Sequence, residues 1–304
     1  MKSVVDLFCG SGGTSCGFRA AGFTPVCAVD MDEAALETYK TNFPQTDCVR
    51  GDIKSTYIKN HLIENYSHVD CVIMCPPCQA FSKRNLTEDK EFDAKNELPF
   101  IAARLVAKMK PKSIFMEEVA QCETIAPKIS KIFEKAGYEV QYTILYASDY
   151  EVPQRRKRFI LIATSDEVEF TPPTPKPEIS VKKALKIRPY PKYGPQVSEK
   201  VLQKILYLQK HGIRLIGGNC AVMDVSKPAP TIHTQSLSSS GPYTIKRGDK
   251  YYSLSTEEVA RLQSYPSSFK FVGTDTAIRR QLGNSVPPML AKHIAKGLRF
   301  VSFS

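Results

Sequence analysis

The chain has 304 residues, of which 42% are hydrophobic and 24% charged, a composition typical of a globular protein with one large or two modest domains. Its apolar runs are too short to cross a membrane, and the first residues enter a strand-like run directly, so we expect no signal peptide. We therefore expect an intracellular protein, cytoplasmic in a prokaryote or nuclear in a eukaryote, with reduced cysteines.

The net charge of +11 belongs entirely to the second part of the sequence. Residues 1–164 contain 21 of the 42 Lys and Arg and 21 of the 31 Asp and Glu; residues 165–304 therefore hold the other 21 basic residues and only 10 acidic ones. Such an imbalance favours a polyanionic partner bound mainly by the second part. A basic surface that serves only solubility is the alternative.

The first predicted element is a strand over residues 4–8, followed by a glycine-rich turn over 9–17 that enters a helix. Glycines at such a turn let the backbone approach a ligand and let the helix pack on the strand. The spacing G-x-G-G-x-x-x-G differs from the G-x-G-x-x-G of nicotinamide enzymes, which disfavours a dinucleotide.

The next two predicted strands each end in a carboxylate. The strand over 25–29 leads to Asp30, where a carboxylate can accept hydrogen bonds from a ribose, and then to Met31, a candidate apolar cover for an adenine. The strand over 47–50 leads to Asp52. Either aspartate could instead cap a helix, but Asp32 and Ser55 are better placed as caps. These strand ends predict a nucleoside pocket without a phosphate clamp.

A buried strand over 69–74 ends abruptly at Cys75-Pro76-Pro77-Cys78-Gln79-Ala80-Phe81-Ser82. Cys78 thus follows the carboxyl end of a strand, where ligands bind in open α/β sheets, and two prolines restrict its approach. This placement predicts that Cys78 is a nucleophile whose position is restricted by the backbone before it. The pair Cys75-x-x-Cys78 could also be a redox pair or half of a zinc site. However, eight of the nine cysteines precede Glu123, and no second pair with zinc-ligand spacing exists.

Strands and helices alternate up to about residue 165, which predicts a doubly wound α/β sheet. We expect helices over 98–109 and 122–136 and strands over 114–116 and 159–163. A proline-rich crossing over 171–177 then marks a domain boundary. We predict a first domain of residues 1–165 plus 274–304, closed by a helix over 288–301, and a basic second domain of residues 166–273 with a helix over 198–210.

Six segments resemble, in order and spacing, the cytosine-C5 DNA methyltransferase family. They are Asp6-Leu7-Phe8-Cys9-Gly10-Ser11-Gly12-Gly13, Pro77-Cys78-Gln79-Ala80-Phe81-Ser82, Glu117-Glu118-Val119, Gln154-Arg155-Arg156-Lys157-Arg158, Arg261-Leu262-Gln263-Ser264-Tyr265-Pro266 and Gln281-Leu282-Gly283-Asn284-Ser285-Val286-Pro287-Pro288. The resemblance implies a Rossmann-like methyltransferase sheet with a smaller target-recognition domain. It implies transfer of a methyl group from S-adenosylmethionine to C5 of a flipped-out cytosine in double-stranded DNA.

The resemblance also implies roles for individual residues. Cys78 would add to C6 of cytosine as a thiolate, Glu117 would bond N3 and the exocyclic amine, and Arg158 with Arg156 would hold O2 or a nearby phosphate. The implied cofactor-binding residues are Phe8, Gly10, Gly12, Gly13, Asp30, Met31, Asp52, Ile53, Asn284 and Ser285. The implied DNA contacts are Gln79, Ser82 and Gln154. We expect no metal and a monomer, with no membrane partner.

Two departures from the family pattern stand beside the proposed nucleophile. Glu118 replaces the usual asparagine, so that an extra carboxylate could raise the pKa of Cys78 or Glu117, and Cys75 stands where glycine is common. A tRNA-methylating branch of the family is the nearest alternative, but its Cys-Phe-Thr signature is absent, since Cys220 precedes Ala221. An inactive DNA-binding relative would be expected to lack Cys78 or Glu117, and both are present.

Overall fold

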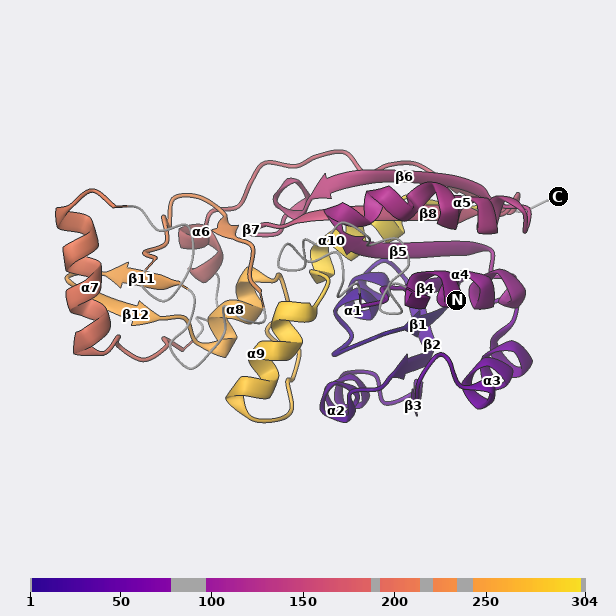
Figure 1. Cartoon of the computed structure of the whole chain (residues 1–304), viewed down its shortest axis with the longest axis horizontal. Helices are drawn as coiled ribbons and strands as arrows, with labels where there is room; N and C mark the ends of the chain where they lie inside the picture. The colour runs from indigo at the N-terminus through magenta and orange to yellow at the C-terminus, as the bar shows by residue number, and fades with distance from the viewer. Residues whose placement is uncertain (1, 78–96, 187–191, 214–220, 234–242, 302–304) are drawn as a thin grey trace.

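The structure, a computed structural model, describes residues 2–77, 97–186, 192–213, 221–233 and 243–301. Figure 1 shows an elongated molecule with a large α/β part at one end and a smaller part at the other. Helix α9 (Asp275–Asn284) lies between them in this view. The predicted fold class, a doubly wound sheet with a second, smaller region, is confirmed. Within the described residues, no helix is both long and apolar enough to span a membrane.

The large part is built on a seven-stranded sheet with the order β3-β2-β1-β4-β5-β8-β6. Its strands are β1 (Lys2–Leu7), β2 (Phe23–Asp30), β3 (Asp47–Arg50), β4 (Cys71–Met74), β5 (Ser113–Val119), β6 (Glu139–Tyr146) and β8 (Lys157–Thr164). Neighbouring strands from β3 to β5 are parallel, and β8 runs antiparallel to both β5 and β6. The carboxyl ends of β1 to β5 therefore meet along one edge, where ligands bind in open sheets.

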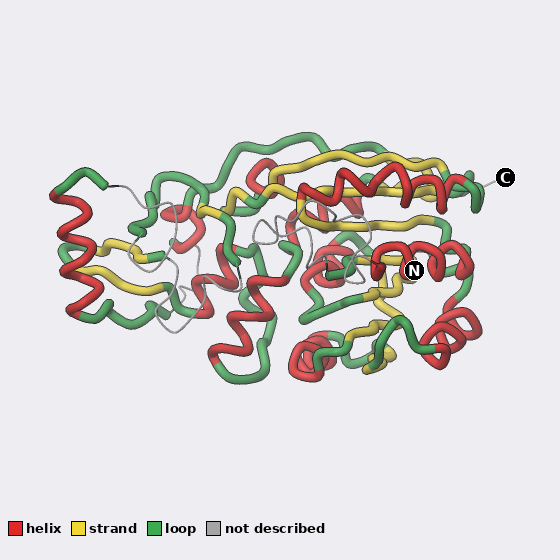
Figure 2. Tube along the Cα trace, in the orientation of Figure 1, coloured by secondary structure: helices red, strands yellow, loops and turns green. Residues whose placement is uncertain are grey.

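Helices cover both faces of this sheet, because successive strand residues point to opposite sides. Val5 belongs to the buried cluster shared with helices α3 (Thr56–Tyr66), α4 (Glu97–Met109) and α5 (Ala126–Glu134). Val4 belongs to the cluster shared with helices α1 (Gly13–Ala20) and α10 (Pro288–Lys296). The layered arrangement of helix and strand is visible in Figure 2. The α10 helix thus closes the large part, as the sequence predicts.

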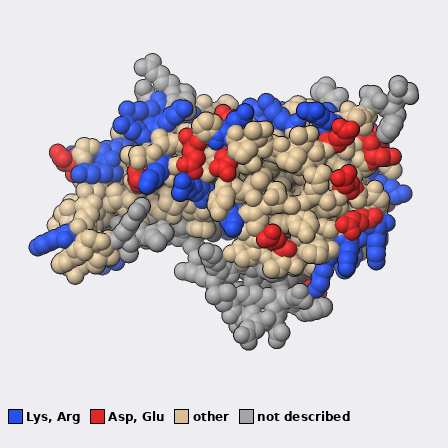
Figure 3. All heavy atoms as spheres, turned by 90° about the horizontal axis from the view of Figure 1, so that it is seen from above, with Lys and Arg blue, Asp and Glu red and all other residues tan. Residues whose placement is uncertain are grey.

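The smaller part contains a two-stranded hairpin with helices around it. Its elements are α6 (Val181–Leu185), α7 (Glu199–Lys210), β11 (Thr244–Arg247), β12 (Lys250–Ser253) and α8 (Thr256–Leu262). It joins the large part through the short parallel pair of β7 (Gln154–Arg155) and β10 (Ala229–Pro230). Figure 3 shows many Lys and Arg side chains over this end of the molecule, at the left of the view, and others along the upper edge and at the right end.

The predicted helix over 288–301 is wrong in its last residues. The α10 helix ends at Lys296, and Leu298–Phe300 form strand β13, which pairs antiparallel with β9 (Val168–Phe170). A Cβ on Gly297 would lie 2.3 Å from the carbonyl oxygen of Thr171, so a larger residue could not make this turn. Residues 168–170 therefore pack with the C-terminal strand, although the predicted boundary at 165 assigns them to the second domain; the domain division itself stays a prediction.

The predicted helix over 122–136 is divided in two. The 3₁₀ helix η3 (Ala120–Ile125) comes first, and α5 follows with a proline in its first turn. Proline favours the start of a helix because it lacks the N–H that the first turn leaves unpaired. The helices predicted over 98–109 and 198–210 are confirmed as α4 and α7. Two elements complete the described chain: α2 (Glu33–Asn42) and the 3₁₀ helix η4 (Ala147–Tyr150).

Candidate active site

The segment that leads to the predicted nucleophile begins at the end of β4. Cys75, Pro76 and Pro77 continue from this strand, and the amide of Cys75 donates to the carbonyl of Leu7 on β1. Cys78, Gln79 and Ser82 lie outside the described residues. Burial, and next the charge of Glu117, raise the pKa of the Cys75 thiol.

Glu117 and Arg158 form a buried ion pair on the strands next to β4. Glu117 lies on β5 and Arg158 on β8, and the antiparallel register places their side chains on the same face. Arg158 Nε is 2.9 Å from Glu117 Oε1. This contact lacks the alignment of a hydrogen bond, so Oε1 has no hydrogen-bond partner among the described residues. The pair thus leaves a buried carboxylate oxygen open to a further donor.

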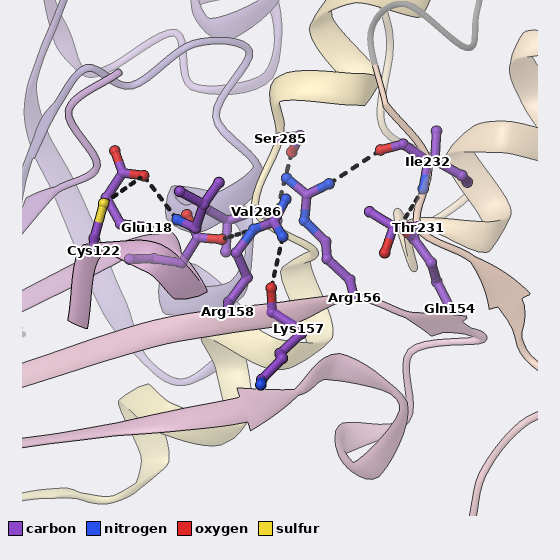
Figure 4. Close-up of polar contacts among 12 residues, drawn as sticks. Glu118, Cys122, Gln154, Arg156, Lys157, Arg158, Thr231, Ile232, Ser285 and Val286 are labelled. Carbon is purple, nitrogen blue, oxygen red and sulfur yellow. Dashed lines mark hydrogen bonds and ion pairs between the residues drawn. The ribbon is translucent and has the colours of Figure 1, made fainter. Parts of the chain in front are cut away.

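Arg156 lies beside Arg158, as Figure 4 shows. Its Nη1 donates to the carbonyls of Ile232 (3.2 Å) and Gly283 (3.4 Å), while its Nε has no hydrogen-bond partner among the described residues. Burial, and next the positive charge of Arg158, lower the pKa of Arg156, and the Glu117 carboxylate opposes this shift. Two buried guanidinium groups therefore lie near the Glu117 carboxylate, and their positive charge would stabilise an anion bound between them.

Glu118, next to Glu117, points to the opposite face of β5. Its Oε2 accepts a hydrogen bond from the amide of Val119 at 2.8 Å, and the Cys122 thiol lies 3.7 Å from the same oxygen. Figure 4 shows Glu118 and Cys122 together, away from Arg156. The sequence-based expectation of opposite faces is confirmed. Glu118 accepts a hydrogen bond from the backbone amide of Val119. The segment around Cys78, which was the other expected partner, lies outside the described residues.

Gln154, predicted to contact DNA, is fully buried in this structure. Its Oε1 accepts from the amide of Ile232, and its Nε2 donates to Oε1 of Gln263 at 2.9 Å. Arg156 binds the carbonyl of the same Ile232. In this structure the side chain is therefore occupied in holding residues 229–232 of the smaller part against β7, and no atom of it reaches the surface.

The predicted nucleoside-binding residues meet at the adjacent ends of β1, β2 and β3. Asp30 Oδ2 accepts from the amide of Gly10, and its Oδ1 accepts from the amide of Asp32, both at 2.8 Å. Asp52 Oδ1 accepts from the amide of Lys54, and the amide of Gly51 donates to the carbonyl of Asp30. Each carboxylate is thus fixed in position and retains lone pairs for a ligand.

The glycines of the turn do two different things. A Cβ on Gly12 would lie 2.7 Å from the ring of Phe43, and one on Gly13 would lie 2.1 Å from Ser285 Oγ. Glycine is therefore required at positions 12 and 13 because Phe43 and Ser285 occupy the space that a side chain would fill. Gly10 has φ of +50°, and apart from its chain neighbours no atom of the described residues lies within 4 Å of such a Cβ, so its open side is available to a ligand.

The C-terminal segment closes over this turn through Ser285. Its hydroxyl contacts the hydroxyl of Tyr265, which also lies 3.3 Å from Ser11 Oγ. Asn284, at the end of α9, is exposed, and Met31 is 63% exposed after β2. Phe8 has φ of +60° and packs partly against the core, and Ile53 is buried there. The structure thus gathers the predicted cofactor residues around one edge of the sheet.

Asp6 is an ionisable residue that the sequence reasoning gave no role. It lies on β1 directly below the turn, where Ser15 Oγ donates to its Oδ2 at 2.6 Å and Tyr39 joins the same hydroxyl. Burial raises the pKa of Asp6 to about 7, while the Ser15 hydrogen bond opposes the shift. The sequence signal was an acid inside an otherwise apolar strand, a position that requires a polar partner from elsewhere in the fold.

Comparisons with known proteins agree with this geometry. A sequence model of C-5 cytosine-specific DNA methylases matches residues 2–299. The chain is 31% identical over 325 residues to the Type II methyltransferase M1.HphI of Haemophilus parahaemolyticus, covering 97% of this chain and 86% of that protein. It is 32% identical over 307 residues to the Type II methyltransferase M.HindV of Haemophilus influenzae, covering 97% and 95%.

A solved structure has the same fold. The methyltransferase EhMeth of Entamoeba histolytica superposes with a TM-score of 0.75, at 17% identity over 96% of each chain. At this identity the likeness concerns the fold alone, while the family match and the Haemophilus relatives cover almost the whole sequence. The chain therefore belongs to the C-5 cytosine-specific DNA methylase family and is a DNA cytosine methyltransferase.

Proposed function

We propose that this enzyme transfers a methyl group from S-adenosylmethionine to C5 of a flipped-out cytosine in a specific site of double-stranded DNA, through a covalent adduct of Cys78. The observation that carries the proposal is the buried group of Glu117, Arg156 and Arg158 beside the segment that leads to Cys78. It combines a carboxylate that has an oxygen without a hydrogen-bond partner among the described residues with two guanidinium groups, all of them buried, which suits a base that gains negative charge during attack.

The residues at the strand ends fit the cofactor. Asp30 would accept hydrogen bonds from the ribose hydroxyls, since its carboxylate is already oriented by two backbone amides. Phe8, Met31, Asp52 and Ile53 would surround the adenine. Open space beside Gly10 would admit the methionine part, with Asn284 and Ser285 closing the pocket. When bound, the cofactor supplies an electrophilic sulfonium methyl group.

In the proposed reaction the chain's own residues prepare the cytosine. The Cys78 thiolate adds to C6 while Glu117 donates a proton toward N3, so that the negative charge of attack is not left on the ring. Arg158 holds O2 of cytosine. Arg156 lies behind it and adds positive charge that favours both the thiolate and the developing anion. After methyl transfer, a water molecule takes the C5 proton, the C6–S bond breaks so that Cys78 leaves as the thiolate, and N3 returns its proton to Glu117, which restores the free enzyme.

DNA would be held mainly by the basic smaller part. Exposed lysines there include Lys200 and Lys204 on α7, and the charge excess lies entirely beyond residue 164. Replacing both with Glu should weaken DNA binding and lower its salt dependence, by a slope of about 0.9 per lost phosphate contact. The matched control combines Lys131→Glu on α5 with Lys135→Glu directly after the end of this helix, and it should leave the slope unchanged. We propose that a monomer suffices, which sedimentation with and without DNA would test.

Trapping on fluorinated DNA tests the covalent step. Elimination needs the C5 proton, so duplexes in which 5-fluorocytosine replaces every cytosine of one strand should hold the enzyme as a complex that survives denaturing gels. Cys78→Ser should abolish the complex, while Cys75→Ser, the matched control, should keep it. A complex that persists in Cys78→Ser would refute the assignment, and trapping on fluorinated tRNA instead of DNA would favour the tRNA alternative.

A further inference from the structure

We propose that Cys27, Asp47 and His61 form a zinc site at the edge of the sheet, separate from the proposed active site. Among the described residues, the sulfur of Cys27, a carboxylate oxygen of Asp47 and a ring nitrogen of His61 all lie within 4.8 Å of one another. No step of the proposed methyl transfer uses any of these three side chains.

The fold brings the three side chains to one face of the sheet. Cys27 on β2 and Asp47 on β3 are direct partners in a parallel pair, so their side chains leave the sheet on the same side. Helix α3 packs over this side, as the shared burial of Cys27 with Ile58 and Leu62 shows. His61 on that helix points its Nε2 at Asp47 Oδ2, 3.0 Å away.

The donor set selects the metal. A thiolate with an imidazole and a carboxylate suits Zn²⁺, whereas Mg²⁺ and Ca²⁺ prefer oxygen ligands alone. Zinc binds these atoms at about 2.0–2.3 Å, so tetrahedral ligands lie roughly 3.5 Å apart. Small rotations of the partly exposed Asp47 and His61 side chains would suffice, since Cys27 is fixed in the sheet.

Hydrogen bonding alone offers a competing explanation for the cluster. The Tyr66 hydroxyl donates to Asp47 Oδ2 at 2.7 Å, on the same oxygen that His61 approaches. Burial, and next the charge of Asp47, raise the pKa of the Cys27 thiol, so without metal it stays protonated. Zinc binding would break the S–H bond, form an S–Zn bond and release the proton to solvent. Metal uptake and thiolate formation therefore distinguish a metal site from a hydrogen-bonded cluster.

The position of the site suggests what a metal would do. β3 has four residues and forms the edge of the sheet, where strands are weakly held. Asp30 follows Cys27 on β2, and Asp52 follows the end of β3. A zinc ion joining β2, β3 and α3 would fix the strands from which both carboxylates extend, without contacting substrate.

Cobalt titration of the full-length, chelator-treated protein tests the proposal. Co²⁺ bound to a thiolate gives a charge-transfer absorption that Zn²⁺ removes by competition, and we expect one equivalent per chain. Cys27→Ser should abolish this absorption. His61→Gln and Asp47→Asn should each weaken Co²⁺ binding by at least about 10-fold, because even outer-shell partners of a metal contribute about 10–100-fold. The matched controls, His68→Gln and Cys16→Ser, should bind as the wild type does.

Thermal unfolding gives a second test. It uses His61→Gln, because His61 is more exposed than Cys27 and its replacement should not prevent folding. One equivalent of Zn²⁺ should raise the melting temperature of the wild type and of His68→Gln but not of His61→Gln, since a ligand that binds only the folded state stabilises it. Absence of stoichiometric thiolate absorption, or absorption that survives in Cys27→Ser or His61→Gln, would overturn the site.

Discussion

Two groups of ionisable side chains lie along the same sheet, and the protein holds them differently. At the ends of β2 and β3, both oxygens of Asp30 accept backbone hydrogen bonds, and Asp52 is held by the amide of Lys54. On β5 and β8, Oε1 of Glu117 and Nε of Arg156 are buried without hydrogen-bond partners among the described residues. Buried polar atoms without partners are rare and costly. The contrast supports the proposal that Asp30 and Asp52 form a preorganised cofactor site and that substrate completes the hydrogen bonding of Glu117 and Arg156.

Glu117→Gln should have the largest effect, because it removes the proposed proton donor from the incomplete cluster. We expect single-turnover methylation to fall by about 10²–10⁴-fold, the usual contribution of a general acid. Binding of S-adenosylmethionine should be unchanged. Glu118→Gln on the opposite face is the matched control and should lose far less. A Glu117→Gln enzyme with near-normal rate would remove the basis for the active-site assignment.

Asp6→Asn should change how the free energy of unfolding of the protein depends on pH. The folded pKa of Asp6 is about 7, against an ordinary value of 3.8, so the folded state binds more protons between these values. The free energy of unfolding should therefore fall as pH rises from about 4 to 7 and level off above, by at most roughly 4 kcal/mol. Asp6→Asn should remove this decline. Urea unfolding at pH 5, 6, 7 and 8 measures it, and an unchanged slope would contradict it.

Asp30→Asn should weaken cofactor binding, with a smaller effect than the loss of rate expected for Glu117→Gln. Both Asp30 oxygens accept from backbone amides, so an asparagine must set its NH₂ against one of these N–H groups. We expect S-adenosylmethionine to bind about 10-fold more weakly, since an unsatisfied buried donor costs about 1–3 kcal/mol. The rate at saturating cofactor should stay near the wild-type value. Equilibrium binding and single-turnover rates measured together check both parts. A loss of rate of about 10-fold at saturating cofactor would contradict the prediction that Asp30 acts in cofactor binding alone.

Periodicity and strand-end chemistry predicted most of the large part, because alternating apolar runs and turns are local signals. Such signals gave the glycine turn, the carboxylates of Asp30 and Asp52, and the order of strands and helices. They did not predict that β13 follows α10, because Leu298–Phe300 is a strand only through its partner β9. Short strands depend on such pairing more than on propensity.

At the candidate active site, too, local sequence signals did not predict contacts between distant parts of the chain. Glu117 and Arg158 were singled out by their segments, and their roles stay predictions; the contacts of Gln154 could not be predicted, because its partners Ile232 and Gln263 come from distant parts of the chain. Likewise, Asp6 becomes interpretable only with Ser15 and Tyr39 in place. Residue type and spacing show which groups are present, whereas tertiary contacts decide which of their hydrogen bonds are already used.

The smallest expected effect is that of Glu118→Asn. Glu118 lies on the face of β5 away from Arg158 and binds the amide of Val119, so its observed task is to brace the turn into η3. Asparagine also offers an acceptor oxygen and is the residue usual in the family, so we expect the methylation rate to change by less than about 3-fold. Glu118→Ala would leave the partly buried amide of Val119 without this acceptor, and we expect it to lower the methylation rate by about 10-fold.

The charge of Glu118 is a separate matter, and the pH profile tests it. Glu118 contributes to the raised pKa of Cys75, although less than burial and Glu117 do. If the same negative charge acts on Cys78, Glu118→Asn should shift the rising limb of the rate profile toward lower pH, because removing a like charge favours the thiolate. If bracing is its whole role, the profiles of the wild type and Glu118→Asn should coincide, while Glu118→Ala is slower at every pH. We expect coincidence, since Glu118 faces away from the Glu117 side of the strand.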